Sequence, residues 1–150
     1  EMEKDGITLE DTTFYLPHLL AGEGLLTKKK PSKKEWDDIN FGKEIALASG
    51  NLDIGQTAIV RKHAVVAVEA MEGTDNCIKR AGELTENFVV VKMAKPKQDL
   101  RFDVPCIGPD TIRNMAAAKG AVLAIEAGKT FLLEKEETIS LADENKIAIV

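Results

Sequence analysis

Apolar and polar positions along the chain follow patterns that are typical of a layered α/β domain. Runs of β-branched or continuously apolar residues predict strands at 7–10, 57–60, 65–68, 88–93, 121–125, 131–133 and 147–150. The second and third of these runs flank a turn around Lys62 and His63, so we expect them to form an antiparallel hairpin. The run at 88–93 is almost wholly apolar, as in a strand that is buried on both faces.

Helices are predicted between these strands, at 14–20, 32–48, 76–84, 109–119 and 136–145. Ser32 and Glu35 form a capping box that opens the second helix, and Gly50 is expected to follow its end. Thr74 or Asp75 is expected to cap the third. Strands that alternate with helices predict an α/β fold, namely a layered domain with a mostly parallel sheet, one antiparallel hairpin and flanking helices.

Composition places the chain in the ordinary globular class. Its 150 residues suit a single domain, with 44% apolar and 30% charged residues. The net charge of -5 provides no global positive field, so we expect no nucleic-acid partner. Two distant cysteines favour a reducing, cytoplasmic setting. The polar start without an initiator methionine leads us to expect a piece cut from a longer chain.

Polar residues gather in four clusters that follow predicted strands or open predicted helices. The clusters span 11–13, 69–75, 92–103 and 108–111. In open α/β sheets, ligands bind in the crevice beyond the carboxyl ends of the strands. Grouped carboxylates suit Mg²⁺, and the neighbouring lysines and arginine suit phosphate oxygens. The clusters together therefore predict metal-assisted phosphoryl chemistry.

Each cluster also has a purely structural interpretation. Asp and Thr are the residue types that cap helices, which explains 11–12, 74–75 and 110–111 equally well. In 99–103, alternation places three charged side chains opposite two apolar ones, as in a surface edge strand. Neither a Walker A loop nor a GxGxxG motif occurs. His18 and His63 are interpreted as structural or solvated, and Lys28–Lys30 as a solvated linker.

A longer series of motifs runs along the chain, in the order Asp11–Phe14 with Leu16–Leu20, Asp53–Gln56, Val68–Ala70 with Glu72–Asp75, Lys92–Pro96, Gln98–Pro105, Ile107–Thr111 and Glu126–Gly128. This series resembles the LpxI-type UDP-2,3-diacylglucosamine pyrophosphatases. The series covers nearly the whole chain, which makes it far more specific than any one motif. Tyr15 and the lysine-rich linker look particular to this sequence.

The resemblance implies an enzyme of lipid A synthesis in Gram-negative bacteria. Such an enzyme uses Mg²⁺ to hydrolyse UDP-2,3-diacylglucosamine to UMP and 2,3-diacylglucosamine 1-phosphate. It is expected in the cytoplasm, associated peripherally with the inner membrane, and a homodimer is compatible with this interpretation. The family has two domains, so the chain is expected to be the C-terminal domain, with a separate N-terminal domain as its partner around the substrate. The isolated piece is then expected to turn over substrate poorly.

Roles follow for the residues of the four clusters. Asp103, Asp75 and Asp99 are predicted to be catalytic, and the predicted metal ligands are Asp103, Asp75, Asp110 and Glu72. The predicted substrate-binding residues are Lys92, Lys95 and Arg101, on the diphosphate, and Thr12, Thr13, Thr74 and Thr111, as hydrogen-bond donors. A non-catalytic nucleotide- or phospholipid-binding module is the alternative function, and a purely structural role for every polar residue is a third.

Overall fold

The computed structural model describes Gly6 and residues 10–150. In chain order the elements are α1 (Thr12–Tyr15), a 3-10 helix η2 (Pro17–Leu19), α2 (Lys33–Asn51), β1 (Thr57–Arg61), β2 (Ala64–Val68), α3 (Thr74–Leu84), β3 (Val89–Lys92), β4 (Cys106–Ile107), α4 (Pro109–Ala117), β5 (Val122–Ile125), β6 (Phe131–Leu132), α5 (Lys135–Glu144) and β7 (Ala148–Ile149). Most predicted elements are present, with the differences given below.

The main sheet has five strands in the order β2-β1-β3-β5-β7. β1 is antiparallel to both of its neighbours, whereas β3, β5 and β7 pair in parallel. Four of these five strands therefore point the same way, and β1 runs against them. β4 and β6 pair in parallel in a separate two-stranded sheet. The predicted α/β class, with a mostly parallel sheet and one hairpin, is confirmed.

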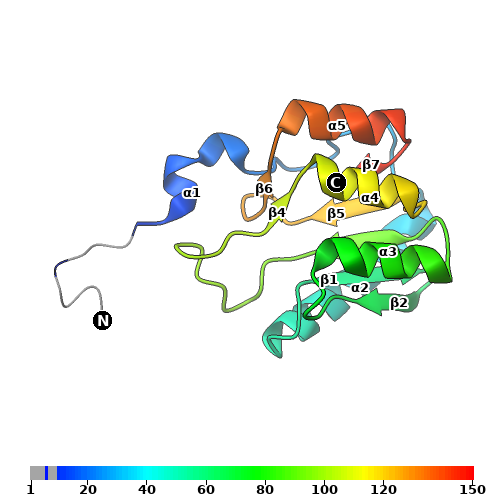
Figure 1. Ribbon diagram of the computed structural model, residues 1–150, viewed down its shortest axis with the longest axis horizontal. Coiled ribbons are helices and arrows are strands. Elements are labelled where there is room, and N and C mark those ends of the chain that lie inside the picture. Colours follow the sequence, from blue (N-terminus) through cyan, green and yellow to red (C-terminus); the bar gives the residue numbers. More distant parts are fainter. Residues whose placement is uncertain (1–5, 7–9) are drawn as a thin grey trace.

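Helices cover both faces of the main sheet (Figure 1). α3, α4 and α5 lie on one face, and α2 packs across β1 and β3 on the other. Side chains of β3 alternate between the two faces, because Val90 joins the core under α3, α4 and α5 while Val89 and Val91 join the core under α2. Lys92 continues the alternation on the side of Val90, so its side chain reaches α3.

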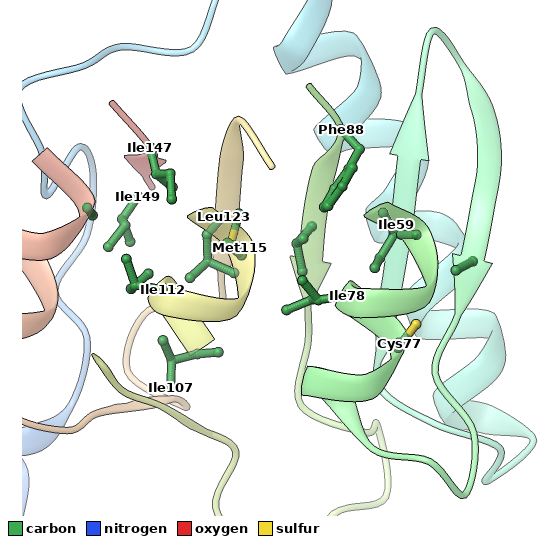
Figure 2. Close-up of a cluster of buried hydrophobic side chains, with 14 of the residues drawn as sticks. Ile59, Cys77, Ile78, Phe88, Ile107, Ile112, Met115, Leu123, Ile147 and Ile149 are labelled. Carbon is green, nitrogen blue, oxygen red and sulfur yellow. The ribbon is translucent and has the colours of Figure 1, made fainter. Parts of the chain in front are cut away.

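The larger core lies between the sheet and the three helices of that face (Figure 2). Ile78 of α3 and Ile112 and Met115 of α4 point toward Leu123 and are fully buried. Burial of each such side chain stabilises the fold by roughly 1.5–3 kcal/mol. This packing holds α3 and α4 side by side on the sheet, which fixes where their N-termini lie.

α2 begins as predicted but ends later. The Ser32 hydroxyl accepts from the Glu35 amide at 3.3 Å, and the Glu35 carboxylate accepts from the Ser32 amide at 2.6 Å. The prediction that Gly50 follows the end of the helix is wrong, because the helix runs to Asn51. A Cβ on Gly50 would lie 3.2 Å from Pro96 Cδ, so this glycine permits a loop to approach the helix.

The N-terminal segment departs from the predicted single helix over 14–20. α1 and η2 are separated at Leu16, which has φ −124° and ψ 43° and precedes Pro17. A residue before proline is disfavoured in the helical region, and that restriction breaks the helix here. The strand predicted at 7–10 falls mainly on residues 7–9, outside the described part of the chain.

The turn between β1 and β2 is confirmed and is fastened to α2. Lys62 and His63 have φ values of 51° and 62°, as a tight hairpin requires. The buried Asp38 carboxylate accepts from both of their amides, at 2.9 and 2.6 Å. The His63 ring stacks on Phe41 with centroids 4.5 Å apart. The structural interpretation of His63 agrees with these contacts.

The lysine-rich segment before α2 is more than a solvated linker. The Lys29 ammonium donates to the Ala121 carbonyl at 2.9 Å, at the amino end of β5. Thr27 is buried, and its hydroxyl accepts from the Ile149 amide at 2.9 Å. The segment thus covers the outer edge of β7 and supplies it with hydrogen-bond partners.

We predict that Gly42→Ala destabilises the protein, although alanine is the better helix former. An added Cβ would lie 2.7 Å from Val91 Cγ2 and 3.2 Å from Val60 Cγ2. Such overpacking costs about 1–3 kcal/mol, against a helix-propensity gain of up to about 1 kcal/mol. Chemical denaturation measures the difference, with Gly22→Ala as control because a Cβ there meets nothing within 4 Å. Equal stability of Gly42→Ala and wild type would contradict the tight α2 contact.

Candidate active site

The carboxyl edge of the main sheet collects side chains from several strands. β2 and β3 end at this edge with Val68 and Lys92, and β1 begins there, since Thr57 pairs with Lys92. The N-termini of α3 and α4 follow β2 and β4 on the same side of the molecule, as the Lys92 contacts below establish. The candidate site therefore lies at the edge where ligands bind in open α/β sheets.

Lys92 lies at the centre of the candidate site and is only 6% exposed. Its ammonium donates to the Thr74 hydroxyl at 3.0 Å and to the Cys106 carbonyl at 3.1 Å. An ammonium has three N–H donors, so one remains for another acceptor. Burial lowers the pKa of Lys92, and the negative charges of Glu69, Asp75 and Asp103 and the Cys106 thiol oppose that shift.

The Thr74 hydroxyl links Lys92 to Glu69. Glu69 directly follows β2 and is 8% exposed, and its Oε1 accepts from Thr74 at 3.1 Å. The Thr57 hydroxyl lies 3.4 Å from that of Thr74. The predicted capping role of Thr74 is wrong, because Gly73, with φ 78°, occupies the cap position and no side chain caps α3. The Thr74 hydroxyl is thereby available to the site.

Asp75 and Thr111 join the N-termini of α3 and α4. The Thr111 hydroxyl donates to the Asp75 carboxylate at 3.0 Å across 36 positions of sequence. Gly108 is the cap residue of α4 and Pro109 occupies its first turn, so neither Asp110 nor Thr111 caps the helix. Two helix N-termini thus face the region around Lys92, and their amides and dipoles favour an anion there.

The long loop between β3 and β4 borders a cavity of about 390 Å³ beside this cluster. Asp53, Lys95, Asp99 and Asp103 are among its lining residues. Lys95 pairs with Asp53 at 2.5 Å, which lowers the pKa of Asp53 and raises that of Lys95. The Asp103 carboxylate accepts from the side-chain amide of Gln98 at 2.7 Å. Residues 100–102 form a turn and residues 99 and 103 are irregular, so the edge strand suggested for 99–103 is not formed.

Arg101 contacts two other predicted site residues. Its guanidinium pairs with Asp99 at 2.7 Å, and this contact lowers the pKa of Asp99. The Arg101 carbonyl accepts from the Thr12 hydroxyl at 3.3 Å, so α1 touches the loop. The Thr13 hydroxyl donates to Asp11, the cap residue of α1, at 2.6 Å. The capping interpretation therefore fits Asp11.

The four carboxylates predicted to bind metal are not brought together. The charges of Asp75 and Asp103 both raise the pKa of Lys92. Glu72 instead pairs with Arg80 at 2.5 Å, and Asp110 with Arg113 at 2.7 Å, each on an exposed surface. Within the described residues, no group of three or more His, Cys, Asp or Glu side chains is arranged to hold a metal ion. Any Mg²⁺ here would need substrate oxygens beside one or two carboxylates.

Several residues of the candidate site are not singled out by the sequence patterns. Glu69 was part of a recognised cluster, and the position directly after a strand could have singled it out instead of Glu72. Cys106 contributes a backbone carbonyl, which no side-chain pattern reveals. Asp53 approaches Lys95 across 42 positions of sequence, a proximity that only the fold creates.

Comparisons with known proteins identify related sequences. The sequence model of a family described as the LpxI C-terminal domain matches residues 22–150. UDP-2,3-diacylglucosamine pyrophosphatase LpxI of Caulobacter vibrioides is 35% identical over 153 residues, covering 96% of this chain and 55% of that protein. The chain thus spans about half the length of this relative. No helix among the described residues is long and apolar enough to cross a bilayer.

We predict that a thiol reagent modifies Cys106 in the native protein and leaves Cys77 intact. The Cys106 thiol is exposed, next to the backbone carbonyl that accepts from Lys92, so a reagent can reach it even though partial burial raises its pKa. Cys77 lies on the buried face of α3, and burial raises the pKa of its thiol to about 11. Mass spectrometry after mild alkylation locates the label, and alkylation in denaturant is the control that labels both cysteines. Rapid native labelling of Cys77 would contradict the packing of α3.

Proposed function

This chain belongs to the LpxI family, and we propose that it forms part of a UDP-2,3-diacylglucosamine pyrophosphatase. The reaction splits the diphosphate of UDP-2,3-diacylglucosamine into UMP and 2,3-diacylglucosamine 1-phosphate. The observation that carries the proposal is the buried Lys92 ammonium where the N-termini of α3 and α4 meet. A diphosphate is the kind of ligand that such a site suits.

The positive elements of the site would bind the diphosphate. Lys92 retains one N–H after its bonds to Thr74 and Cys106. The amides at the start of α3 are additional donors, because no side chain caps that helix. α4 adds fewer donors, because Pro109 has no N–H and the Thr111 amide already donates to the Gly108 carbonyl at 3.1 Å. Lys95 and Arg101 lie on the neighbouring loop, where their charges would attract the substrate. Together these groups stabilise charge that builds up on phosphoryl oxygens during hydrolysis.

The carboxylates would position the attacking water. Water must add to one phosphorus as the bond to the bridging oxygen breaks, and it loses a proton, which a neighbouring carboxylate would accept. Asp103 and Asp75 are the proposed residues for positioning this water, with Asp99 beside Asp103 at the cavity. Mg²⁺, bound by Asp103 or Asp75 together with substrate oxygens, would polarise the phosphoryl group. Thr111 holds Asp75 in place.

The remaining parts of the activity are proposed for the longer protein. The matched relative is nearly twice the length covered here. We propose that an N-terminal domain supplies a second wall around the substrate, which carries two acyl chains and needs more apolar surface than the polar Lys92 cluster offers. Cytoplasmic location, peripheral association with the inner membrane and homodimer formation belong to the same proposal.

A binding module without chemistry is the second candidate. It is favoured by the absence, among the residues described, of any three-ligand carboxylate or histidine group for a metal. Such a module would bind the uridine diphosphate group at Lys92 and leave hydrolysis to another part of the protein. The two candidates differ in whether Asp103 affects turnover or only binding.

We predict that Asp103→Ala in the full-length protein lowers turnover at least about 10²-fold, since a water-positioning carboxylate acts mainly on the transition state. UMP release from UDP-2,3-diacylglucosamine at fixed Mg²⁺ is the measurement, with a thermal melt to verify folding. Asp37→Ala is the matched control, because Asp37 is exposed on α2 away from the site. Turnover of Asp103→Ala near that of wild type would exclude Asp103 from the chemistry.

A further inference from the structure

Glu69 is a buried acidic residue to which the proposed reaction assigns no role. One carboxylate oxygen accepts from the Thr74 hydroxyl at 3.1 Å. The other oxygen, Oε2, is buried and has no hydrogen-bond partner among the described residues. A buried carboxylate with an unsatisfied oxygen is costly for the fold, so a compensating interaction is expected. The positive charge of Lys92 provides one.

We propose that Glu69 is a positioning residue for Lys92, which it orients through the Thr74 hydroxyl and keeps protonated for the substrate diphosphate. The inference rests on the proposed function for the identity of the ligand. The Lys92, Thr74 and Glu69 contacts themselves are independent of it. Glu69 need not touch the substrate, because its effect passes through Lys92.

The direction of the hydrogen bonds follows from the donor inventory. A hydroxyl has one proton to donate, and an ionised carboxylate can only accept. With Glu69 as the acceptor, the Thr74 proton points away from Lys92, and the oxygen lone pairs face the ammonium. This arrangement suits a protonated lysine. A glutamine at 69 could donate to Thr74 instead and let the hydroxyl turn its proton toward a neutral amine.

Charges from several elements act on the same ammonium. Glu69 follows β2, Asp75 lies in α3, Asp103 lies in the long loop and Cys106 opens β4, and all four raise the pKa of Lys92 against the effect of burial. Glu69 has the largest of these effects. It is therefore the acidic side chain whose loss should change the protonation of Lys92 most.

The backbone holds Glu69 in this position. Its amide donates to the Thr57 carbonyl at 2.9 Å, and a Cβ on Gly55 would collide with the Glu69 carbonyl. Gly55 therefore lets the segment before β1 lie directly against Glu69. Because β1 is antiparallel to β2, this segment and Glu69 meet at the same edge of the sheet. Contacts of both its backbone and its side chain therefore hold Glu69 in place.

The test is an NMR titration of the Lys92 side chain in this chain, in metal-free buffer. Carbon signals next to the lysine amine report its protonation, and Lys92→Arg identifies the signal. In Glu69→Gln we expect the Lys92 titration to move to lower pH by about one pH unit, the scale of losing one nearby opposite charge. Glu86→Gln is the matched control, because Glu86 pairs with Lys119 at the opposite edge of the sheet.

Two further variants keep the test decisive if Glu69→Gln does not fold. Thr74→Val removes the linking hydroxyl and should also move the Lys92 titration to lower pH, whereas Lys92 in Thr74→Ser should titrate at the wild-type pH. The proposal is overturned if Lys92 titrates at the wild-type pH in Glu69→Gln. If Glu69→Gln is unfolded, a wild-type Lys92 titration in Thr74→Val overturns the proposal instead. An equal shift of the Lys92 titration in Glu86→Gln would also overturn it, since the effect would then not be specific to Glu69.

Activity measurements on the full-length protein separate this inference from the proposed function. The alkaline limb of the kcat/KM profile for UMP release should move to lower pH in Glu69→Gln and stay in place in Glu86→Gln. A wild-type protein that releases no UMP would refute the proposed function and leave the NMR result to decide the role of Glu69. A moved NMR titration with an unchanged activity limb would refute the role of Glu69 toward substrate.

Discussion

Burial of one lysine ammonium at the edge of the sheet is the constraint on which the candidate site depends. Taking the Lys92 charge out of water is unfavourable, as the lowered pKa of this lysine indicates. The fold offsets the cost with a hydroxyl, a backbone carbonyl and surrounding acidic groups. Each of these partners comes from a different element, so the site forms only when β3, α3 and β4 are all in place.

The antiparallel strand β1 contributes to the site in a way that a wholly parallel sheet would not. β1 begins at the edge where β2 and β3 end. Gly55, which precedes β1, and Thr57, its first residue, therefore lie at the carboxyl edge of the sheet. The pairing brings them against Glu69 and Thr74. The hairpin is held at its other end by Asp38 of α2. Packing of α2 and the geometry of the site are therefore connected through β1.

The sequence predicts the elements well because their periodicity reflects local physics. The capping box at Ser32, the hairpin turn at Lys62 and the buried run of β3 each depend on neighbours in sequence, and all three are confirmed. The break at Leu16 also has a local cause, the proline that follows it, whereas long-range packing decides where α2 ends. Gly50 stays inside α2 because a loop packs against it.

Candidate site residues were harder to predict, since one residue type serves two purposes. Threonine is a favoured cap residue at the start of a helix, yet Gly73 takes that position in α3 and leaves the Thr74 hydroxyl available to Lys92. Thr13 donates to Asp11, which caps α1. The strand-end rule directs attention to this edge of the sheet, but only the fold distinguishes Glu69, which is linked to Lys92 through Thr74, from Glu72, which pairs with Arg80.

The most direct test of the account is where a diphosphate binds on this chain. Uridine diphosphate, titrated with Mg²⁺ into the isotope-labelled chain, would be followed through its backbone amide signals. The account predicts that the largest shifts fall at 73–76, 92–94 and 108–111, around Lys92 and the two helix N-termini. Shifts confined to the opposite edge of the sheet, at 86–87 and 119–121, would contradict it.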